Sequence, residues 1–485
     1  KVLIDPEING FLKWALGIVL TTVLFFCLAD VSSGDTKGPL KRVGHVHGSQ
    51  HKTPDSISTQ TLGEDGRLYH LVFSTDCTEY QHWQSYLLFH SALKVKQPGF
   101  VTRIASGCSD SESEDIRKWH HENIQSVMSD RFQLHLTPHF SAVKDADGNS
   151  SGQDYKYFNK PFGLRHWMEH GEGMGFDINT GKMMNEDMVV ILTDPDMLLL
   201  RPITGDFSNK RETIVSGPKK VQHFLTVQHG QPFAQKYGFG SQWKTKINDV
   251  DEITGPGSPV NSVSYFDALN RYSVGPPYLA TARDMHSISV KWSEFVPGVH
   301  KQYPYLLAEM FAFCLAAAHL ELPHQVVDSL MVSNPIAGGG EGWQLIHKID
   351  KKDICSVAQS PDHEKYAVPS VIHFCQRYNV GPWFFAKRRI PKDIFSCDSP
   401  LLREPELDIA VKYDYKITPE GAKVQSQSSV VSASSFAICV LIQAVNDAAH
   451  YYKQTKCDGG GNQDKTIVFV KTDLFDDEWN KNVRK

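Results

Sequence analysis

The stretch MVVILTDPDMLLLRPI, from Met188 to Ile203, decides the predicted fold. Its first five residues, Met188 to Leu192, are apolar without alternation, which is typical of a strand buried on both faces of an α/β sheet. Pro195 lacks an N–H, so the strand should stop there, with Asp194 and Asp196 at its carboxyl end. Open α/β sheets bind ligands at that end, where two carboxylates can share Mg²⁺ or Mn²⁺ with the phosphates of a substrate. An isolated Asp-x-Asp is also a common surface turn, so the rest of the chain has to decide.

Composition indicates a globular protein that does not have nucleic acid as its main partner. The 485 residues are 41% hydrophobic, 11% aromatic and 22% charged, and a net charge of −5 leaves no basic footprint. Nine cysteines are compatible with an oxidising compartment, although their spacings neither define a disulfide pairing nor form a zinc signature. Asn149, in Asn149-Ser150-Ser151, is a candidate glycosylation site.

The N-terminal part predicts a membrane anchor followed by a stem. Residues 14–29, WALGIVLTTVLFFCLA, carry no charge, and Phe11 and Leu12 extend this run across Lys13 toward the roughly 20 residues that span a bilayer. A cleaved signal peptide is the alternative interpretation. Residues 30–66 have few large apolar residues, as in a flexible stem, so we expect the bulk of the protein to be lumenal or extracellular. The expected parts are an N-terminal segment at 1–29 with the anchor at about 11–29, the stem at 30–66, a catalytic domain at 67–410 and an extension of uncertain structure at 411–485.

Downstream of the stem, predicted strands and helices alternate. A strand, a helix and a strand in succession form a βαβ unit, whose crossover should be right-handed. The first predicted strand ends in Thr75 and Asp76, whereas Arg103 in the second is either a surface residue or a cation near a diphosphate. The three segments are RLYHLVFSTDC (67–77), HWQSYLLFHSALK (82–94) and FVTRIASGC (100–108).

Two predicted helices carry polar residues near their starts. Asn159 can cap a helix in YFNKPFGLRHWMEH (157–170), where Lys160 opposes the helix dipole unless an anionic ligand lies nearby. The segment YPYLLAEMFAFCLAAAHLEL (303–322) is apolar on nearly every face and therefore predicts a buried helix. Glu309, near its start, either complements the helix dipole or meets a substrate hydroxyl as a base or hydrogen-bond acceptor.

The sequence is less regular between these helices and after them. Residues 204–300 predict mixed loops and short helices, with a short strand and an acceptor-side loop between Tyr278 and Trp292. The segment PSVIHFCQRYNVGPWFFAK (369–387) predicts a last strand with His373 at its end, and a turn at Gly381-Pro382-Trp383. Histidine is a common ligand of divalent metals, although a single histidine at a strand end is usually a satisfied polar residue.

Five blocks within about Leu68–Glu404 together resemble a family of enzymes. The resemblance is to the hydroxyproline O-arabinosyltransferases and the related peptidyl serine α-galactosyltransferases of plants and algae. It implies the glycosyltransferase A-type fold, a Rossmann-like mixed α/β sheet flanked by helices, in a single-pass type II protein of the Golgi or ER membrane with a lumenal catalytic domain. The blocks are FVTRI (100–104), YFNKPFGLRHWM (157–168), LTDPDMLLLRPI (192–203), AEMFAFCLAAA (308–318) and VIHFCQRYNVGPWFFAK (371–387).

The resemblance also implies roles for residues at matching positions. Asp194, Asp196 and His373 would bind Mn²⁺ or Mg²⁺, which would bridge the diphosphate of a UDP-sugar donor. Glu309 would act with Asp196 in catalysis, on the side of a hydroxyproline- or serine-containing protein acceptor. The arabinosyltransferases tend to have Glu-Pro-Asp where this chain has Asp-Pro-Asp, and the VGPWFFAK block is nearer to the galactosyltransferases, so the transferred sugar is left open as a pentose or a hexose. The expected donor-binding residues are Thr75, Asp76, Arg103, Asn159, Lys160 and Trp383.

The chemistry of the predicted site favours transfer over two other functions. A sugar nucleotide leaves as a diphosphate, whose developing charge a bound metal can stabilise by several kcal/mol. A phosphohydrolase could use the same carboxylates, but no nucleophile motif is visible, and the anchor and stem argue against it. A catalytically silent sugar-binding or scaffold protein of the secretory pathway is the third possibility, against which the intact Asp194, Asp196 and His373 argue.

Overall fold

The expected anchor, most of the expected stem and the sequon at Asn149 lie outside the described residues. Of the stem, residues 62–66 are described, and Leu62 forms an isolated antiparallel bridge with Leu68. The computed structural model describes residues 62–140, 155–217, 224–337, 339–360, 365–414, 416–417, 423–424 and 428–468.

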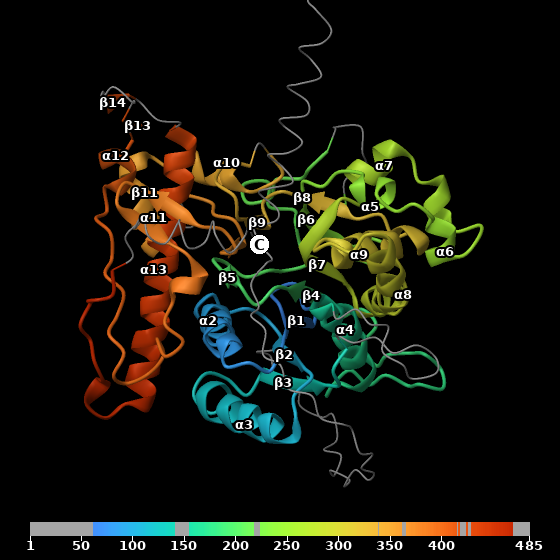
Figure 1. The fold of residues 1–485 in the computed structure, drawn as a ribbon, viewed down its shortest axis with the longest axis horizontal. Coiled ribbons are helices and arrows are strands. Elements are labelled where there is room, and N and C mark those ends of the chain that lie inside the picture. Colours follow the sequence, from blue (N-terminus) through green and yellow to red (C-terminus); the bar gives the residue numbers. More distant parts are fainter. Residues whose placement is uncertain are drawn as a thin grey trace, which may run out of the picture.

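A seven-stranded mixed sheet forms the centre of the protein (Figure 1). Its strand order is β3-β2-β1-β4-β7-β6-β8; β3, β2, β1 and β4 are parallel, whereas β7 is antiparallel to its neighbours β4 and β6. The mixed α/β sheet flanked by helices that the sequence predicts is therefore confirmed. The strands are β1 (Tyr69–Thr75), β2 (Phe100–Ser106), β3 (Phe132–Thr137), β4 (Val189–Thr193), β6 (Phe233–Lys236), β7 (Val274–Thr281) and β8 (Gln325–Val327).

Strand β4 is buried on both faces, as its unbroken apolar run predicts. Val189 and Ile191 face one hydrophobic cluster, and Val190 and Leu192 face the other. Because successive side chains of a strand point to opposite faces, every side chain of a strand covered on both sides is buried, and apolar residues are favoured at each position. Polar residues are therefore confined to its end.

Helices cover both faces of the sheet. Helices α2 and α13 belong to one hydrophobic cluster, and α4, α8 and α9 belong to the other, on the opposite side in Figure 1. The helices are α2 (Tyr80–Lys94), α3 (Asp110–His120), α4 (Asn159–His170), α5 (Gln242–Thr245), α6 (Val250–Thr254), α7 (Tyr265–Asn270), α8 (Ala282–Gln302), α9 (Ala308–His319), α10 (Trp343–Ile346), α11 (Ile354–Gln359), α12 (Ile409–Lys412) and α13 (Ser428–Lys456).

A small three-stranded sheet continues directly from the end of β4. Its strand β5 begins one residue after Asp196 and pairs antiparallel with β10, so that Met197 lies opposite His373. The N–H of Phe374 donates to the carbonyl oxygen of Asp196 at 3.0 Å. This pairing brings a distant part of the chain to the acidic turn. The remaining strands are β5 (Met197–Leu199), β9 (Met331–Val332), β10 (Val371–His373), β11 (Tyr378–Val380), β12 (Trp383–Phe385), β13 (Lys416–Ile417) and β14 (Lys423–Val424).

The expected strand near Tyr278 is present, but the expected acceptor-side loop is wrong, because helix α8 takes its place. Strand β7 has eight residues at the centre of the sheet, and α8 has 21 residues. Prolines in strands remove ladder donors and argue against a central strand, which is why the sequence predicted only a short strand here. Pro276 and Pro277 are accommodated because the β6–β7 pairing is irregular there, passing from Tyr278 directly to Gly275.

The C-terminal helix α13, beyond the range expected for the catalytic domain, packs into its core. It contacts α2, α11 and β11, and the disulfides Cys355–Cys439 and Cys397–Cys457 attach it to neighbouring segments. Of the described helices, α13 is long and apolar enough to cross a membrane by length and composition, but 67% of its apolar window is buried inside the protein. Such burial is what a core helix requires.

Lys453 is a buried charged residue that joins the end of α13 to the segment 396–399, which precedes α12. Its ammonium donates to the carbonyl oxygens of Ser396, Cys397 and Ser399 at 2.8, 3.2 and 2.6 Å. We expect Lys453→Met to lower the free energy of unfolding by about 2–4 kcal/mol, because buried acceptors lose their donors. Urea unfolding followed by tryptophan fluorescence measures the change. The exposed Lys456→Met is the control, and equal stabilities of the two variants would contradict the assignment.

Candidate functional site

The order of the strands sets the position of the site. β2 and β3 lie on one side of β1 and β4 lies on the other, so the order in which strands are added to the sheet reverses between β1 and the parallel strand β4. Loops that leave neighbouring strands in opposite directions open a crevice beyond the carboxyl ends of those strands. Thr75 and Asp76 at the end of β1 and Asp194 after β4 line one pocket of about 140 Å³ in that crevice.

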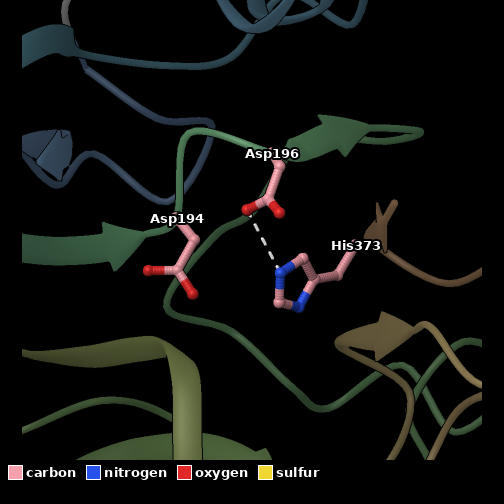
Figure 2. A group of neighbouring side chains, drawn as sticks. All are labelled: Asp194, Asp196 and His373. Carbon is pink, nitrogen blue, oxygen red and sulfur yellow. Dashed lines mark ion pairs between the residues drawn. The ribbon is translucent and has the colours of Figure 1, made fainter. Parts of the chain in front are cut away.

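Asp194, Asp196 and His373 form a buried cluster beside this pocket. Their side chains point toward one another (Figure 2), and one ligand atom from each lies within 4.8 Å of the others. The Nε2 atom of His373 is 3.1 Å from Oδ1 of Asp196. The register of β5 against β10 sets this distance, because it places His373 opposite the residue that follows Asp196.

The cluster fits a divalent metal ion. His373 Nε2 is buried next to the carboxylate, but no described acceptor is aligned with it for a hydrogen bond. A buried polar atom without a hydrogen bond is costly, and a bound metal would satisfy it. Two carboxylates and one imidazole suit Mn²⁺ or Mg²⁺ and leave coordination positions for phosphate oxygens.

Lysines neutralise both carboxylates. Lys160 Nζ lies 2.7 Å from Oδ1 of Asp194, and Lys387 Nζ lies 2.9 Å from Oδ2 of Asp196. Burial alone would raise the pKa of Asp196, but Lys387 and His373 hold the pKa of that carboxyl well below its usual range. Burial lowers the pKa of His373, and the carboxylate of Asp196 more than compensates, so the net shift is upward. Asp196 is therefore ionised at neutral pH.

Glu309 lies on the wall of the same pocket, in the first turn of α9. Its carboxylate is buried, with Oε1 3.4 Å from Lys160 Nζ. Burial raises the pKa of Glu309 to about 7, against the opposing effect of Lys160 and with a further upward contribution from Asp194. A carboxyl group with this pKa can exchange a proton at neutral pH.

Two other elements hold the backbone of Glu309 in place. The phenol of Tyr155 accepts a hydrogen bond from the Glu309 N–H at 3.2 Å and donates one to the carbonyl oxygen of Leu306 at 2.8 Å. The indole of Trp292 donates to the carbonyl oxygen of Glu309 at 2.8 Å. Leu307, at the N-cap of α9, has no side-chain acceptor, so Tyr155 satisfies one of the N–H groups that a helix start leaves unpaired.

We expect Tyr155→Phe to lower the free energy of unfolding by about 1–2 kcal/mol, because the helix start loses its acceptor while the ring packing is kept. Thermal or urea unfolding measures the loss. Tyr303→Phe, which removes a phenol that takes no part in these hydrogen bonds, is the matched control. A Tyr155→Phe protein as stable as the control would show that this phenol does not cap α9.

Four of the residues predicted to bind the donor line the pocket: Thr75, Asp76, Asn159 and Lys160. Asn159 and Lys160 begin α4, but the expected cap at Asn159 is wrong: Phe158 is the N-cap, and no described side chain caps the helix. The side-chain oxygen of Asn159 instead accepts a hydrogen bond from the N–H of Phe140 at 3.0 Å. The start of a helix thus faces the same space as the acidic cluster, which favours anionic ligands.

Arg103 and Trp383 are not among the described residues that line the pocket. Arg103 is fully buried in β2; its Nε donates to the hydroxyl of Thr75 at 2.9 Å, and its Nη2 donates to the carbonyl oxygen of Asp76 at 3.3 Å. Arg103 therefore holds Thr75 and Asp76 in position by hydrogen bonds without lining the pocket itself. Trp383 is buried in β12, where its indole donates to Glu406 at 3.1 Å.

Sequence reasoning missed two lysines that line the pocket. Lys156 lies in the short 3-10 helix Lys156–Phe158 before α4, and Lys387 begins another, Lys387–Arg389, after β12. Burial lowers the pKa of Lys156 to about 8. Lys387 is the last residue of the VIHFCQRYNVGPWFFAK block, so a positive charge at the end of that block was the sequence feature that could have identified it. With Lys160, three lysines surround one small pocket, which suits a ligand with several negative charges.

Comparisons with known proteins find distant sequence similarity to a glycosyltransferase. No family model matches the chain. The chain is 25% identical over 353 residues to the peptidyl serine alpha-galactosyltransferase of Arabidopsis thaliana, a match that covers 71% of this chain and 34% of that protein. The chain thus spans about a third of the length of that relative. A solved structure of the WbbM bifunctional glycosyltransferase in its apo form has a TM-score of 0.28 and 9% identity, covering 66% of this chain and 47% of that one.

Proposed function

We propose that this chain is a metal-dependent glycosyltransferase of the Golgi or ER membrane. It would transfer a hexose or pentose from a UDP-sugar to the hydroxyl of a serine or hydroxyproline in a protein of the secretory pathway. One observation carries the proposal: the buried cluster of Asp194, Asp196 and His373 adjoins a pocket lined by several lysines. The sequence similarity to a peptidyl serine alpha-galactosyltransferase favours galactose and serine within these alternatives.

On the donor side, the site binds and neutralises a diphosphate. Asp194, Asp196 and His373 would hold a divalent cation, which when bound supplies positive charge to the oxygens of the leaving diphosphate. Lys156 and Lys160 line the same pocket and would orient the phosphates by charge-assisted hydrogen bonds. Such groups are effective because they are already aimed at the place where negative charge develops.

On the acceptor side, Glu309 is placed to accept the proton of a hydroxyl. Its ionised form would hydrogen-bond the hydroxyl and take its proton as the new glycosidic bond forms. Lys160, which contacts both Asp194 and Glu309, connects the two sides of the pocket and orients the carboxylate. Its positive charge also favours the ionised form of Glu309.

We expect the protein to bind UDP-sugars with Mn²⁺ and to lose that binding in chelator. Calorimetry with a panel that includes UDP-galactose and UDP-arabinofuranose measures both the metal requirement and the sugar preference. Asp196→Asn should weaken the Mn²⁺-dependent binding by about 100-fold, because it removes a charged ligand. Asp393→Asn, at an exposed position, is the control. Tight binding without metal would refute the metal dependence, and no binding by any nucleotide sugar would refute the proposal and favour a silent scaffold.

Glu309→Gln should lower turnover by roughly 100-fold or more while donor affinity stays within about twofold, because the amide keeps the shape but cannot take a proton. Wild-type turnover should rise as the pH increases through the pKa of Glu309, about 7 in the metal-free site. Bound metal should move that rise to lower pH, since it offsets the charge of Asp194.

Steady-state pH profiles of wild type and Glu309→Gln test this assignment together with donor calorimetry. Glu294→Gln, in an ion pair with Lys291 on α8, is the matched control, and its profile should follow wild type. Wild-type turnover in Glu309→Gln would reduce Glu309 to a structural residue at the start of α9.

A further inference from the structure

We propose that Lys387 is a catalytic lysine that exchanges between two anions. It pairs with Asp196 when the site holds no ligand, and with the diphosphate of the donor when metal and nucleotide are bound. The inference rests on the proposed function and deepens it, because it makes one side chain responsible for coupling metal binding to donor binding.

The position of Lys387 places its ammonium between the two anions. Its Nζ lies 2.9 Å from Oδ2 of Asp196, and its side chain is only 11% exposed. The same side chain lines the pocket together with Lys156 and Asp76. A small movement about the torsions of the lysine stem would carry the ammonium from the carboxylate into the pocket, because the stem has four flexible carbons.

Asp196 cannot keep both of its present contacts and also coordinate a metal ion with the same oxygens. Its Oδ1 faces His373 at 3.1 Å and its Oδ2 faces Lys387 at 2.9 Å, so both oxygens already have a partner. A divalent cation held by Asp194 and Asp196 would lie within a few ångströms of the ammonium. Like charges at that separation repel strongly in a buried site. The ammonium therefore competes with the metal until an anion arrives to receive it.

Lys160 differs from Lys387 in a way that assigns the exchange to Lys387. Lys160 contacts two carboxylates, Asp194 at 2.7 Å and Glu309 at 3.4 Å, so it keeps an anionic partner when a metal takes Asp194. The described ion pair of Lys387 is with Asp196, a residue of the metal cluster. A diphosphate brings the negative charge that would pair with Lys387 after that exchange.

The exchange predicts opposite effects of one substitution on two affinities. In Lys387→Met, Mn²⁺ alone should bind about tenfold more tightly, because the competing ammonium is gone. UDP in saturating Mn²⁺ should bind about tenfold more weakly, because the diphosphate loses a charged donor. Without metal Lys387 stays paired with Asp196, so UDP alone should bind the variant as it binds wild type, and the factor by which UDP tightens Mn²⁺ binding should fall about tenfold, by thermodynamic linkage. Titration calorimetry with Mn²⁺ and with UDP measures all three quantities without an acceptor or a transferred sugar.

Two further variants keep the test decisive. Lys387→Arg retains the charge, so both affinities should stay within about threefold of wild type. Lys392→Met removes an exposed lysine and should leave both unchanged. A parallel loss of both affinities in Lys387→Met, an unchanged Mn²⁺ affinity, or an unchanged UDP affinity would each overturn the exchange. If Lys387→Met does not fold, a Lys387→Arg protein that folds but departs from wild type in either affinity overturns it as well.

The same titrations separate this inference from the proposed function. A wild-type protein that binds neither Mn²⁺ nor UDP overturns both. A wild-type protein that binds both, with a Lys387→Met variant that does not shift them in opposite directions, overturns only the role of Lys387.

Discussion

An ionised carboxylate that leaves water needs positive charge close by, and this chain buries Asp194 and Asp196 side by side at the end of a core strand. Each has a lysine within 3 Å, and Asp196 also has the ring of His373. These partners come from three separate segments: the start of α4, the end of β10 and the turn after β12. The need to neutralise two acids therefore constrains where distant parts of the chain must converge.

The fold meets this requirement with two sheets that share one turn. β4 belongs to the central sheet and β5 to the small sheet, and the Asp-Pro-Asp sequence connects them. The central sheet places the turn at the reversal of strand order beside β1, while the β5–β10 pairing brings in His373. The two acids thus stand at the junction of both sheets, where neither can move without disturbing a strand.

The C-terminal helix supports the segment that carries the cations. α13 contacts β11 and β12, the two strands that precede Lys387 in the chain. Disulfides attach α13 to α11 and to the loop near Ser396. Lys453 closes that loop by donating to its carbonyl groups. On the other side, Tyr155 and Trp292 fix the backbone of Glu309. The pocket is therefore held from both faces of the sheet by elements that do not line it.

Local patterns in the sequence predicted β4, the acids at its end and the buried helix of Glu309, because apolar periodicity involves only neighbouring residues. They also predicted a helix at Asn159, but not how it begins, since Phe158 is its N-cap and no described side chain caps it. The sequence also singled out His373, but could not bring it to Asp196, since strand pairing joins residues by register rather than by distance along the chain. The central position of β7 in the sheet depends on its pairing with β6, whose irregularity accommodates Pro276 and Pro277, and this pairing is visible only in the folded protein. Arg103 was expected in the pocket and lies outside it, whereas Lys387 was not expected there and lines it. The reason is the same. A charged side chain lies behind a site or inside it according to how the elements pack, and that packing is set by contacts between residues far apart in the chain.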